Sequence, residues 1–298
     1  MSAFSLDDMA LFVEVARAGN FSRACVKLGI PNATLSRRIA TLERELGVRL
    51  FERSTRRVTM TSAARGWFDR CAPIIDELRV AHEALRGEDA ELEGSVKIST
   101  PVDFGITYLG EWLPEFCRRN PRVTLDLDLS PRQVDLFAEA VDVAIRLEPP
   151  HDERLVVRRI GSIPRGLFAG PAYLERHGVP RTLEDLASHR CLFIGSAAKG
   201  VTWRLGPPGA EHRVAVQGQV GLNNMSLTRI LAERDLGIAL LPVDLARPSL
   251  MGGTLAQVLP RVPMGGWPVH VVTTSRQQRA PVRALVEFIE RRLKAASA

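Results

Sequence analysis

The chain has 298 residues, enough for two or three folded units, and its 45% hydrophobic and 25% charged residues are typical of a globular protein. No apolar run reaches the length of a membrane span, and Asp7 and Asp8 give the N-terminus the wrong charge for a signal or transit peptide, so we expect a cytoplasmic protein without a membrane partner. The net charge of +6 is concentrated in residues 1–60, which hold ten Lys and Arg against six Asp and Glu, as a nucleic-acid-binding module requires, although a solvated basic surface would have the same charge.

The first fifty residues contain three stretches of helical periodicity. They predict helices over 6–18, 22–28 and 32–46. Ser5 and Ser22 are suitable N-caps for the first two, and each of the three segments is followed by a glycine suited to end it. The short turn at 29–31 joins the second and third helices, which predicts a helix-turn-helix whose second helix lies in the major groove. The apolar stripe expected to face inward on that helix is Leu35, Ile39, Leu42 and Leu46.

The opposite face of the third helix carries polar and basic side chains that can reach base edges and phosphates. After it, residues 49–53 and 58–61 predict two short strands, and the basic turn between them would be the tip of a wing. The predicted DNA-binding residues are Asn32, Ala33, Thr34, Ser36, Arg37, Arg38, Thr41, Arg53, Thr55, Arg56 and Arg57.

The motifs of this region resemble the N-terminus of the LysR-type transcriptional regulators. They match in order and spacing, at 12–16 (FVEVA), 19–24 (GNFSRA), 35–39 (LSRRI), 42–43 (LE), 45–53 (ELGVRLFER) and 58–61 (VTMT). The resemblance implies a winged helix-turn-helix that binds an interrupted palindromic site in double-stranded DNA. One departure is Asn32, where the family commonly has Gln; Asn is shorter but keeps the amide that reads adenine.

A long linker helix is predicted over 61–85, with Thr61 as N-cap and Gly87 as stop. Its heptad seam is Trp67, Cys71, Ile74, Leu78, Ala81 and Leu85. The seam could pack on its own chain, but the resemblance favours a dimer through this helix and implies a tetramer, with RNA polymerase as a further partner. Pro73 lies inside the helix and predicts a kink there or an earlier break.

Beyond an acidic hinge at 88–93, strands and helices alternate. Strands are predicted over 96–99, 123–129, 141–145, 166–169, 191–194, 238–241 and 269–274. Helices are predicted over 109–119, 134–140, 172–176, 227–233 and 281–294. This rhythm indicates an α/β fold with a mostly parallel sheet covered by helices on both faces.

The resemblance extends into this region through 141–146 (VDVAIR), 170–174 (GPAYL) and 237–242 (GIALLP). It implies a C-terminal effector domain similar to periplasmic binding proteins, with two lobes joined by strands that cross near 162–165 and 265–268. The expected multidomain α/β division is 1–60 for DNA binding, 61–87 for the linker, 88–93 for the hinge and 94–298 for the effector domain. Lobe one would comprise 94–164 and 267–298, and lobe two 165–266.

Ligands of open α/β sheets bind at the carboxyl ends of strands, which selects the candidate effector residues. They are Ser99, Thr100, Pro101, Val102, Asp103, Ser130, Arg146, Leu147, Gly195, Ser196, Leu222 and Asn223. Ser99, Thr100 and Arg146 suit a small anionic or polar molecule, although the first two could simply cap a helix and the third could form a surface ion pair.

Two other classes of protein are weighed against a regulator. An enzyme is disfavoured because the sequence has no nucleophile elbow, phosphate loop or dinucleotide fingerprint, and its six histidines have no metal-ligand spacing. A periplasmic solute receptor would need a signal peptide and no DNA reader. The four cysteines form no Cys-x-x-Cys pair, so we expect buried thiols rather than a redox sensor, and neither a metal nor a cofactor.

Overall fold

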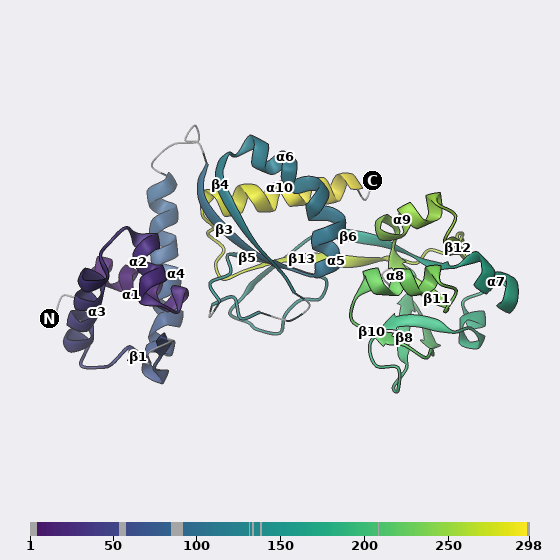
Figure 1. Ribbon diagram of the computed structural model, residues 1–298, viewed down its shortest axis with the longest axis horizontal. Helices are drawn as coiled ribbons and strands as arrows, with labels where there is room; N and C mark the ends of the chain where they lie inside the picture. The colour runs from purple at the N-terminus through teal and green to yellow at the C-terminus, as the bar shows by residue number, and fades with distance from the viewer. Residues whose placement is uncertain are drawn as a thin grey trace.

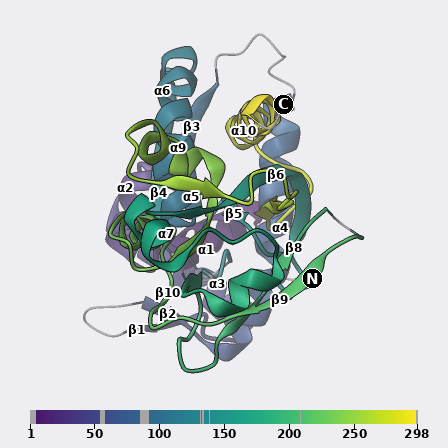
Figure 2. The same ribbon diagram turned by 90° about the vertical axis from the view of Figure 1, so that its right-hand side faces the viewer.

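A computed structural model of the chain describes residues 5–53, 58–84, 92–130, 132, 134–137, 139–207 and 209–296. An N-terminal helical unit, a long helix and two α/β lobes follow one another in a row (Figure 1), and Figure 2 views that row end-on. The α/β fold with an N-terminal helix-turn-helix is confirmed.

Three short helices form the N-terminal unit: α1 (Leu6–Ala18), α2 (Phe21–Leu28) and α3 (Asn32–Leu46). The side chain of Ser5 accepts a hydrogen bond from the Asp7 amide, and each helix ends at a glycine in the left-handed conformation, as predicted. The predicted cap of α2 is wrong. Asn20 is the N-cap, because its extended backbone lets its side-chain oxygen Oδ1 accept from both the Ser22 and the Arg23 amides.

A buried cluster of apolar side chains holds these helices and the wing strands together. Leu35, Ile39 and Leu42 of α3 are buried in it, as the periodicity predicted. Phe12 lies at its centre and contacts the rings of Phe51, Trp67 and Phe68. The wing strands are shorter than predicted, since β1 (Phe51–Arg53) pairs with β2 (Val58–Met60) in antiparallel register.

The linker helix α4 (Ser62–Ala84) is capped by Thr61, whose hydroxyl accepts from the Ala64 amide at 3.1 Å. The helix continues through Pro73, so the predicted earlier break is wrong. A proline removes one backbone hydrogen bond, and burial of Ala72 and Ile75 on either side stabilises the helix at this point. Leu85, Gly87 and hinge residues 88–91 lie outside the described residues.

The predicted seam of α4 divides into two parts. Trp67 and Cys71 pack into the core of their own chain, so their assignment to a dimer interface is wrong. Ile74 and Leu78 are 52% and 51% exposed and have the apolar surface that a paired helix would cover. The division follows from α4 packing against α1 along its first half.

The first lobe is built on three parallel strands in the order β5–β3–β4. They are β3 (Glu93–Thr100), β4 (Arg122–Leu129) and β5 (Val143–Arg146). Glu93 pairs with Arg122, so β3 begins at the last residue assigned to the hinge. The helices of this lobe are α5 (Val102–Phe104), the π-helix η1 (Gly105–Leu109), α6 (Gly110–Arg119) and α10 (Ala280–Ala296).

The helix predicted over 134–140 is wrong: the described residues there form turns rather than a helix. Asp135 accepts from the Phe137 amide through its side chain, and Ala140 has a φ of 51°, which a right-handed helix excludes. The helix predicted over 109–119 corresponds to α6, and the helical elements α5 and η1, which were not predicted, precede it from Val102.

The second lobe repeats the parallel arrangement in the order β10–β7–β11. Its strands are β7 (Cys191–Ile194), β8 (Val201–Leu205), β9 (His212–Val216), β10 (Gly221–Leu222), β11 (Ile238–Pro242) and β12 (Ala256–Val258). Its helices are α7 (Pro171–His177), the 3-10 helix η2 (Glu184–Ser188), α8 (Met225–Glu233) and α9 (Val243–Met251). The sequence analysis did not predict β8, β9, β10, β12 or α9.

Two long strands run from one lobe into the other (Figure 1): β6 (Val156–Ala169) and β13 (Gly266–Thr273). They pair with each other in antiparallel register, with Trp267 opposite Ile163. Arg165 fastens this crossing, because its Nε donates to the Met264 carbonyl at 2.7 Å and its guanidinium lies 5.3 Å from the centre of the Trp267 ring. These two strands are therefore the covalent connection between the lobes.

Candidate DNA-binding and effector-binding sites

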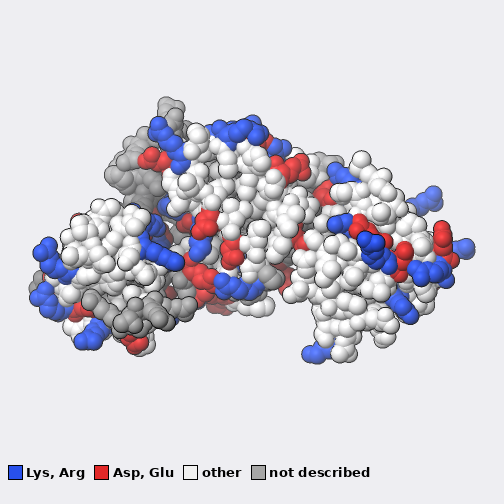
Figure 3. Space-filling model, viewed as in Figure 1, with Lys and Arg blue, Asp and Glu red and all other residues white. Residues whose placement is uncertain are grey.

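The outer face of α3 presents the side chains predicted to read DNA. Asn32, Ala33 and Arg37 are exposed, while Thr34, Ser36 and Thr41 are partly covered. Lys and Arg gather along the outer edge of the helical unit (Figure 3), where Figure 1 draws α3. The second helix of a helix-turn-helix inserts into the major groove, so this face suits direct readout.

Contacts within the protein distinguish the two arginines of this face. The Arg38 Nε donates to the Asp8 carboxylate at 2.6 Å, which ties that side chain to α1. For Arg37, by contrast, no hydrogen bond or ion pair is found among the described residues, and its exposed guanidinium can take the two acceptors of a guanine. Arg37 is therefore the stronger candidate for base readout.

The wing tip, which the sequence predicts to contact phosphate, falls outside the described part of the chain. This applies to Thr55, Arg56, Arg57 and the side chain of Arg53. The paired strands β1 and β2 that flank the tip are described.

The candidate effector residues of lobe one lie together at the carboxyl ends of β3, β4 and β5. Ser99 and Thr100 are buried, and Ser130 follows β4 and donates its amide to the Thr100 carbonyl at 3.0 Å. Arg146 donates to the Ser99 carbonyl at 3.2 Å and to its hydroxyl at 2.9 Å. Ser99 thus positions Arg146 at the end of β5.

Arg146 is a partly buried cation. Burial lowers the pKa of its guanidinium, and the charge of Asp128 offsets part of that effect. Among the described residues, no carboxylate lies within ion-pairing distance of Arg146, so a surface ion pair does not account for it. Arg146 also lines a cavity of about 310 Å³ enclosed by residues of 134–155 and Val272.

The carboxylate of Asp103 forms hydrogen bonds with residues of lobe two. It accepts from the Met225 amide at 2.8 Å, from the Ser226 amide at 3.0 Å and from the Ser226 hydroxyl at 2.5 Å. These donors belong to the first turn of α8 in lobe two, so the Asp103 carboxylate is occupied by contacts between the lobes in this structure.

The other candidates occupy the expected ends of strands. Pro101 and Val102 start α5, and Leu147 follows β5 and packs against the core of lobe one. In lobe two, the Gly195 amide donates to the Leu222 carbonyl at 2.8 Å, which places Ser196 and Asn223 beside the ends of two parallel strands. Each lobe therefore gathers its predicted residues at one sheet edge.

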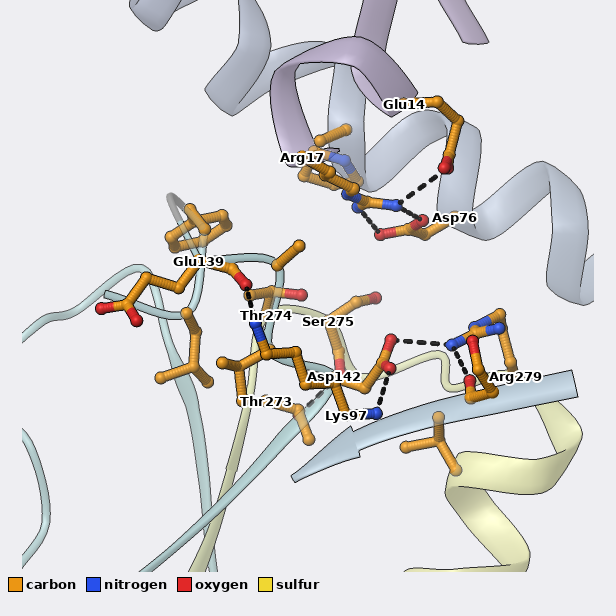
Figure 4. A pocket seen from close by; sticks show the side chains of 18 of the residues that line it. Glu14, Arg17, Asp76, Lys97, Glu139, Asp142, Thr273, Thr274, Ser275 and Arg279 are labelled. Carbon is orange, nitrogen blue, oxygen red and sulfur yellow. Dashed lines mark hydrogen bonds and ion pairs between the residues drawn. The ribbon is translucent and has the colours of Figure 1, made fainter. Parts of the chain in front are cut away.

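A larger cavity of about 550 Å³ lies between the N-terminal unit and lobe one (Figure 4). On one wall, Arg17 makes two hydrogen bonds to Asp76, at 2.8 and 2.6 Å. On the facing wall, Asp142 accepts from Arg279 and from the Lys97 amide, each at 2.8 Å. Its walls come from six separate segments of the chain, which no local sequence pattern connects.

Among the described residues, no group of three or more His, Cys, Asp or Glu side chains is placed to share a metal ion. None of their helices combines the length and the apolar character needed to span a bilayer.

Comparison with known proteins identifies both parts of the chain. Residues 6–65 match the bacterial regulatory helix-turn-helix proteins of the lysR family, and residues 89–294 match the LysR substrate binding domain. An uncharacterised HTH-type transcriptional regulator of Haemophilus influenzae is 30% identical over 272 residues, covering 91% of this chain and 94% of its own. The HTH-type transcriptional regulator DmlR of Escherichia coli is 31% identical over 288 residues, covering 95% and 93%.

Solved structures agree with this result. The full-length virulence activator AphB of Vibrio cholerae is 28% identical, with a TM-score of 0.56 over 96% of this chain and 98% of its own. A full-length OxyR variant of Pseudomonas aeruginosa has a TM-score of 0.74 over 98% of this chain and 95% of its own, and at 18% identity it shows the fold alone. The chain therefore belongs to the LysR-type transcriptional regulators, which join a helix-turn-helix DNA-binding domain to an effector-binding domain.

Proposed function

We propose that this regulator is a cytoplasmic protein, without enzymatic activity, that binds an interrupted palindrome in double-stranded DNA and responds to a small anionic molecule. Residues 1–60 would read the DNA, 61–87 would pair two chains, 88–93 would transmit the response, and 94–298 would bind the effector. Two such dimers would form a tetramer, and bound DNA would present the protein to RNA polymerase.

The exposed face of α3 supports the DNA-binding part of this proposal. Arg37, Asn32 and Ser36 point away from the buried stripe, and the charge of the helix suits phosphate and base contacts. A pair of modules is needed because one module covers half of a palindrome. The half-exposed Ile74 and Leu78 of α4 offer the surface for that pairing.

The position of Arg146 is the main support for the proposed effector binding. Arg146 is a partly buried cation at the carboxyl end of a parallel strand, where open α/β sheets bind ligands. Arginine takes carboxylates and phosphates in a two-point arrangement, so we propose an organic acid or phosphate as effector. Ser130, Leu147, Gly195, Ser196, Leu222 and Asn223 would complete the site, with the Pro101 and Val102 amides at the start of α5.

A thermal-shift screen of organic acids and sugar phosphates tests the effector site. Wild-type protein should be stabilised by a compound that also changes DNA affinity, and Arg146→Met should lose both effects while keeping basal DNA binding. A ligand at a hundred times its Kd stabilises by about 2.7 kcal/mol, which is readily detected. Arg118→Met, on the exposed side of α6, is the matched control.

Because coupling between two sites is reciprocal, DNA must change the affinity for the effector by the same factor. Equal stabilisation of wild type and Arg146→Met by the same compounds would place the effector elsewhere. Compounds that stabilise the protein without changing its DNA affinity would argue against effector control.

A further inference from the structure

Two side-chain contacts join the lobes in addition to the crossing strands, and both start from the segment that follows β3. Asp103 of α5 reaches the first turn of α8, and Tyr108 of η1 reaches α9. In Figure 1, α5 lies at the side of lobe one that faces α8 and α9. Asp103 lies 122 residues before its partner Met225, and Tyr108 lies 136 residues before its partner Asp244.

The Asp103 contact satisfies backbone groups that a helix leaves open. The first amides of an α-helix have no partner within the helix. In α8 the Asn224 side chain accepts from the Leu227 amide, and the carboxylate of Asp103 accepts from the amides of Met225 and Ser226. Lobe one therefore supplies the anionic cap for a helix of lobe two, where the helix dipole favours negative charge.

Both partners of the Tyr108 contact are held by other residues of their own lobe. The Tyr108 ring is 4% exposed and lies 5.1 Å from Phe104 and 5.3 Å from Trp112, within the core of lobe one. Its hydroxyl donates to the Asp244 carboxylate at 3.1 Å, and Asp244 also accepts from Arg247 at 2.6 Å. Burial and the Asp244 charge raise the pKa of Tyr108, so the hydroxyl keeps its proton and remains a donor.

The backbone between the two residues is also unusual. Residues Gly105–Leu109 form a π-helix, a rare geometry that often occurs at functional sites. A Cβ atom at Gly105 would clash with the Leu129 side chain, so η1 packs tightly against the end of β4. The segment that carries both contacts is therefore held by the same strand ends that carry the candidate effector residues.

We propose that Asp103 and Tyr108 form an interlobe clasp, which holds the two lobes together beside the effector site and must be released when they separate. Both side chains are then positioning residues rather than effector ligands. The clasp itself does not depend on the effector, whereas its regulatory consequence rests on the proposed function. If effector entry requires the lobes to part, weakening the clasp speeds effector binding.

Electron paramagnetic resonance distance measurements on full-length protein test the clasp without any ligand. One spin label is placed on Cys117, exposed on α6 of lobe one, and the other on Met251→Cys, since Met251 is 85% exposed on α9 of lobe two. Cys25 is replaced by Ser, and Cys71 and Cys191 are buried. Labelled chains are diluted with unlabelled protein, so that distances within one chain dominate.

Wild type should show a single narrow distance. Asp103→Ala and Tyr108→Phe should each broaden the distribution or shift it to longer distances, and the double variant should do so most strongly. Hydrogen exchange at the Met225 and Ser226 amides should rise about tenfold or more in Asp103→Ala. Tyr108→Phe removes one hydroxyl and keeps the packed ring, so it remains informative if Asp103→Ala folds poorly.

Asp185→Ala is the matched control, because Asp185 accepts from the amides of Arg181 and Thr182, at 2.8 and 3.0 Å, entirely within lobe two. It should leave the interlobe distance unchanged. Distances in Asp103→Ala and Tyr108→Phe that equal the wild-type distance would overturn the clasp, even if exchange at α8 increased, because Asp103 would then be a local helix cap. This result would leave the proposed effector function untouched, since the screen with Arg146→Met tests that function separately.

Discussion

The ion pair between Arg17 and Asp76 should fix the linker helix against the helix-turn-helix, and its removal can be predicted in detail. Arg17 belongs to α1 and Asp76 to α4, and two hydrogen bonds of 2.8 and 2.6 Å join them. Both side chains are 18% exposed, so water screens the pair only partly. The orientation of α4 relative to α1 determines how a pair of linker helices would space two recognition helices.

The size of the effect follows from burial and geometry. Fully exposed ion pairs contribute about 0–1 kcal/mol, whereas hydrogen bonds to charged groups contribute about 1.5–3 kcal/mol when partly buried. We therefore expect Asp76→Ala to lower the free energy of unfolding of the N-terminal unit by about 2 kcal/mol. The coupling energy in a double-mutant cycle with Arg17→Ala should be about 1–2 kcal/mol, because Arg17 keeps a weaker contact with Glu14 at 3.9 Å.

Fluorine NMR of protein labelled with 5-fluorotryptophan measures this stability unit by unit. Trp67 packs 4.7 Å from Phe12 and reports the N-terminal core, while Trp112, Trp203 and Trp267 report the lobes. The matched control is the pair of Arg119 and Glu115 on α6, where Arg119 is 69% exposed and the coupling should stay below about 0.5 kcal/mol. Equal coupling energies for the two pairs would refute the argument from burial.

Three further outcomes follow from the same structure and sequence. Replacing Arg56 and Arg57 by Ala should weaken binding to all DNA sequences alike. In salt titrations, the slope of the logarithm of the binding constant against the logarithm of the salt concentration should fall in magnitude by about two. A changed site preference with an unchanged slope would contradict this prediction. Leu78→Glu should place two like charges opposite each other where two copies of α4 pair. The protein should then sediment as a smaller species and lose operator binding, and an unchanged sedimentation would exclude this interface. The Tyr173 hydroxyl accepts from the Arg190 amide and lies 3.2 Å from His189 Nδ1, to which it can donate when that nitrogen carries no proton. Burial and His177 lower the pKa of His189, so the unfolded state binds more protons and the unfolding free energy of lobe two falls as pH drops below the ordinary His value of 6.5. Melting followed at Trp203 from pH 8 to 5 should show a shallower decline in His189→Gln, and an identical decline in both proteins would count against this role.

Local signals predicted the N-terminal unit well, because each of its elements is defined by neighbouring residues. Helical periodicity placed Leu35 and Ile39 inside, and glycines in the left-handed conformation ended the helices where expected. The error at α2 was to place the N-cap at Ser22 rather than at Asn20, two residues earlier; both side chains can cap a helix, and only Asn20 has the extended backbone of a cap. Cap preferences alone do not separate them.

Features that depend on distant packing could not be predicted from sequence. Trp67 and Cys71 fit a heptad seam, but the position of α1 in space decides that they face their own core. The apolar spacing of 134–140 suited a helix, yet the described residues there form turns. In the first case tertiary contacts overrode the local pattern, and in the second the Asp135 side chain bonds a nearby backbone amide in a turn.

The effector residues show the same limit. The rule for open α/β sheets selected Arg146 because it depends on strand ends that the sequence reveals, and Arg146 lies at the end of β5 as expected. It also selected Asp103, whose partners lie 121 to 123 residues away in another lobe. Tyr108 and Asp244 were missed for the same reason, since no local motif links residues 136 positions apart.

The central claim is that α3 reads DNA sequence through Arg37, and selection of bound genomic DNA tests it most directly. Purified wild-type protein should enrich a site with two related half-sites, and Arg37→Ala should lose roughly 5- to 150-fold in affinity for that site, equivalent to about 1–3 kcal/mol. Arg118→Ala, on the exposed side of α6, should bind as wild type does. Enrichment of the same site by Arg37→Ala with undiminished affinity would contradict the assignment of base readout to Arg37.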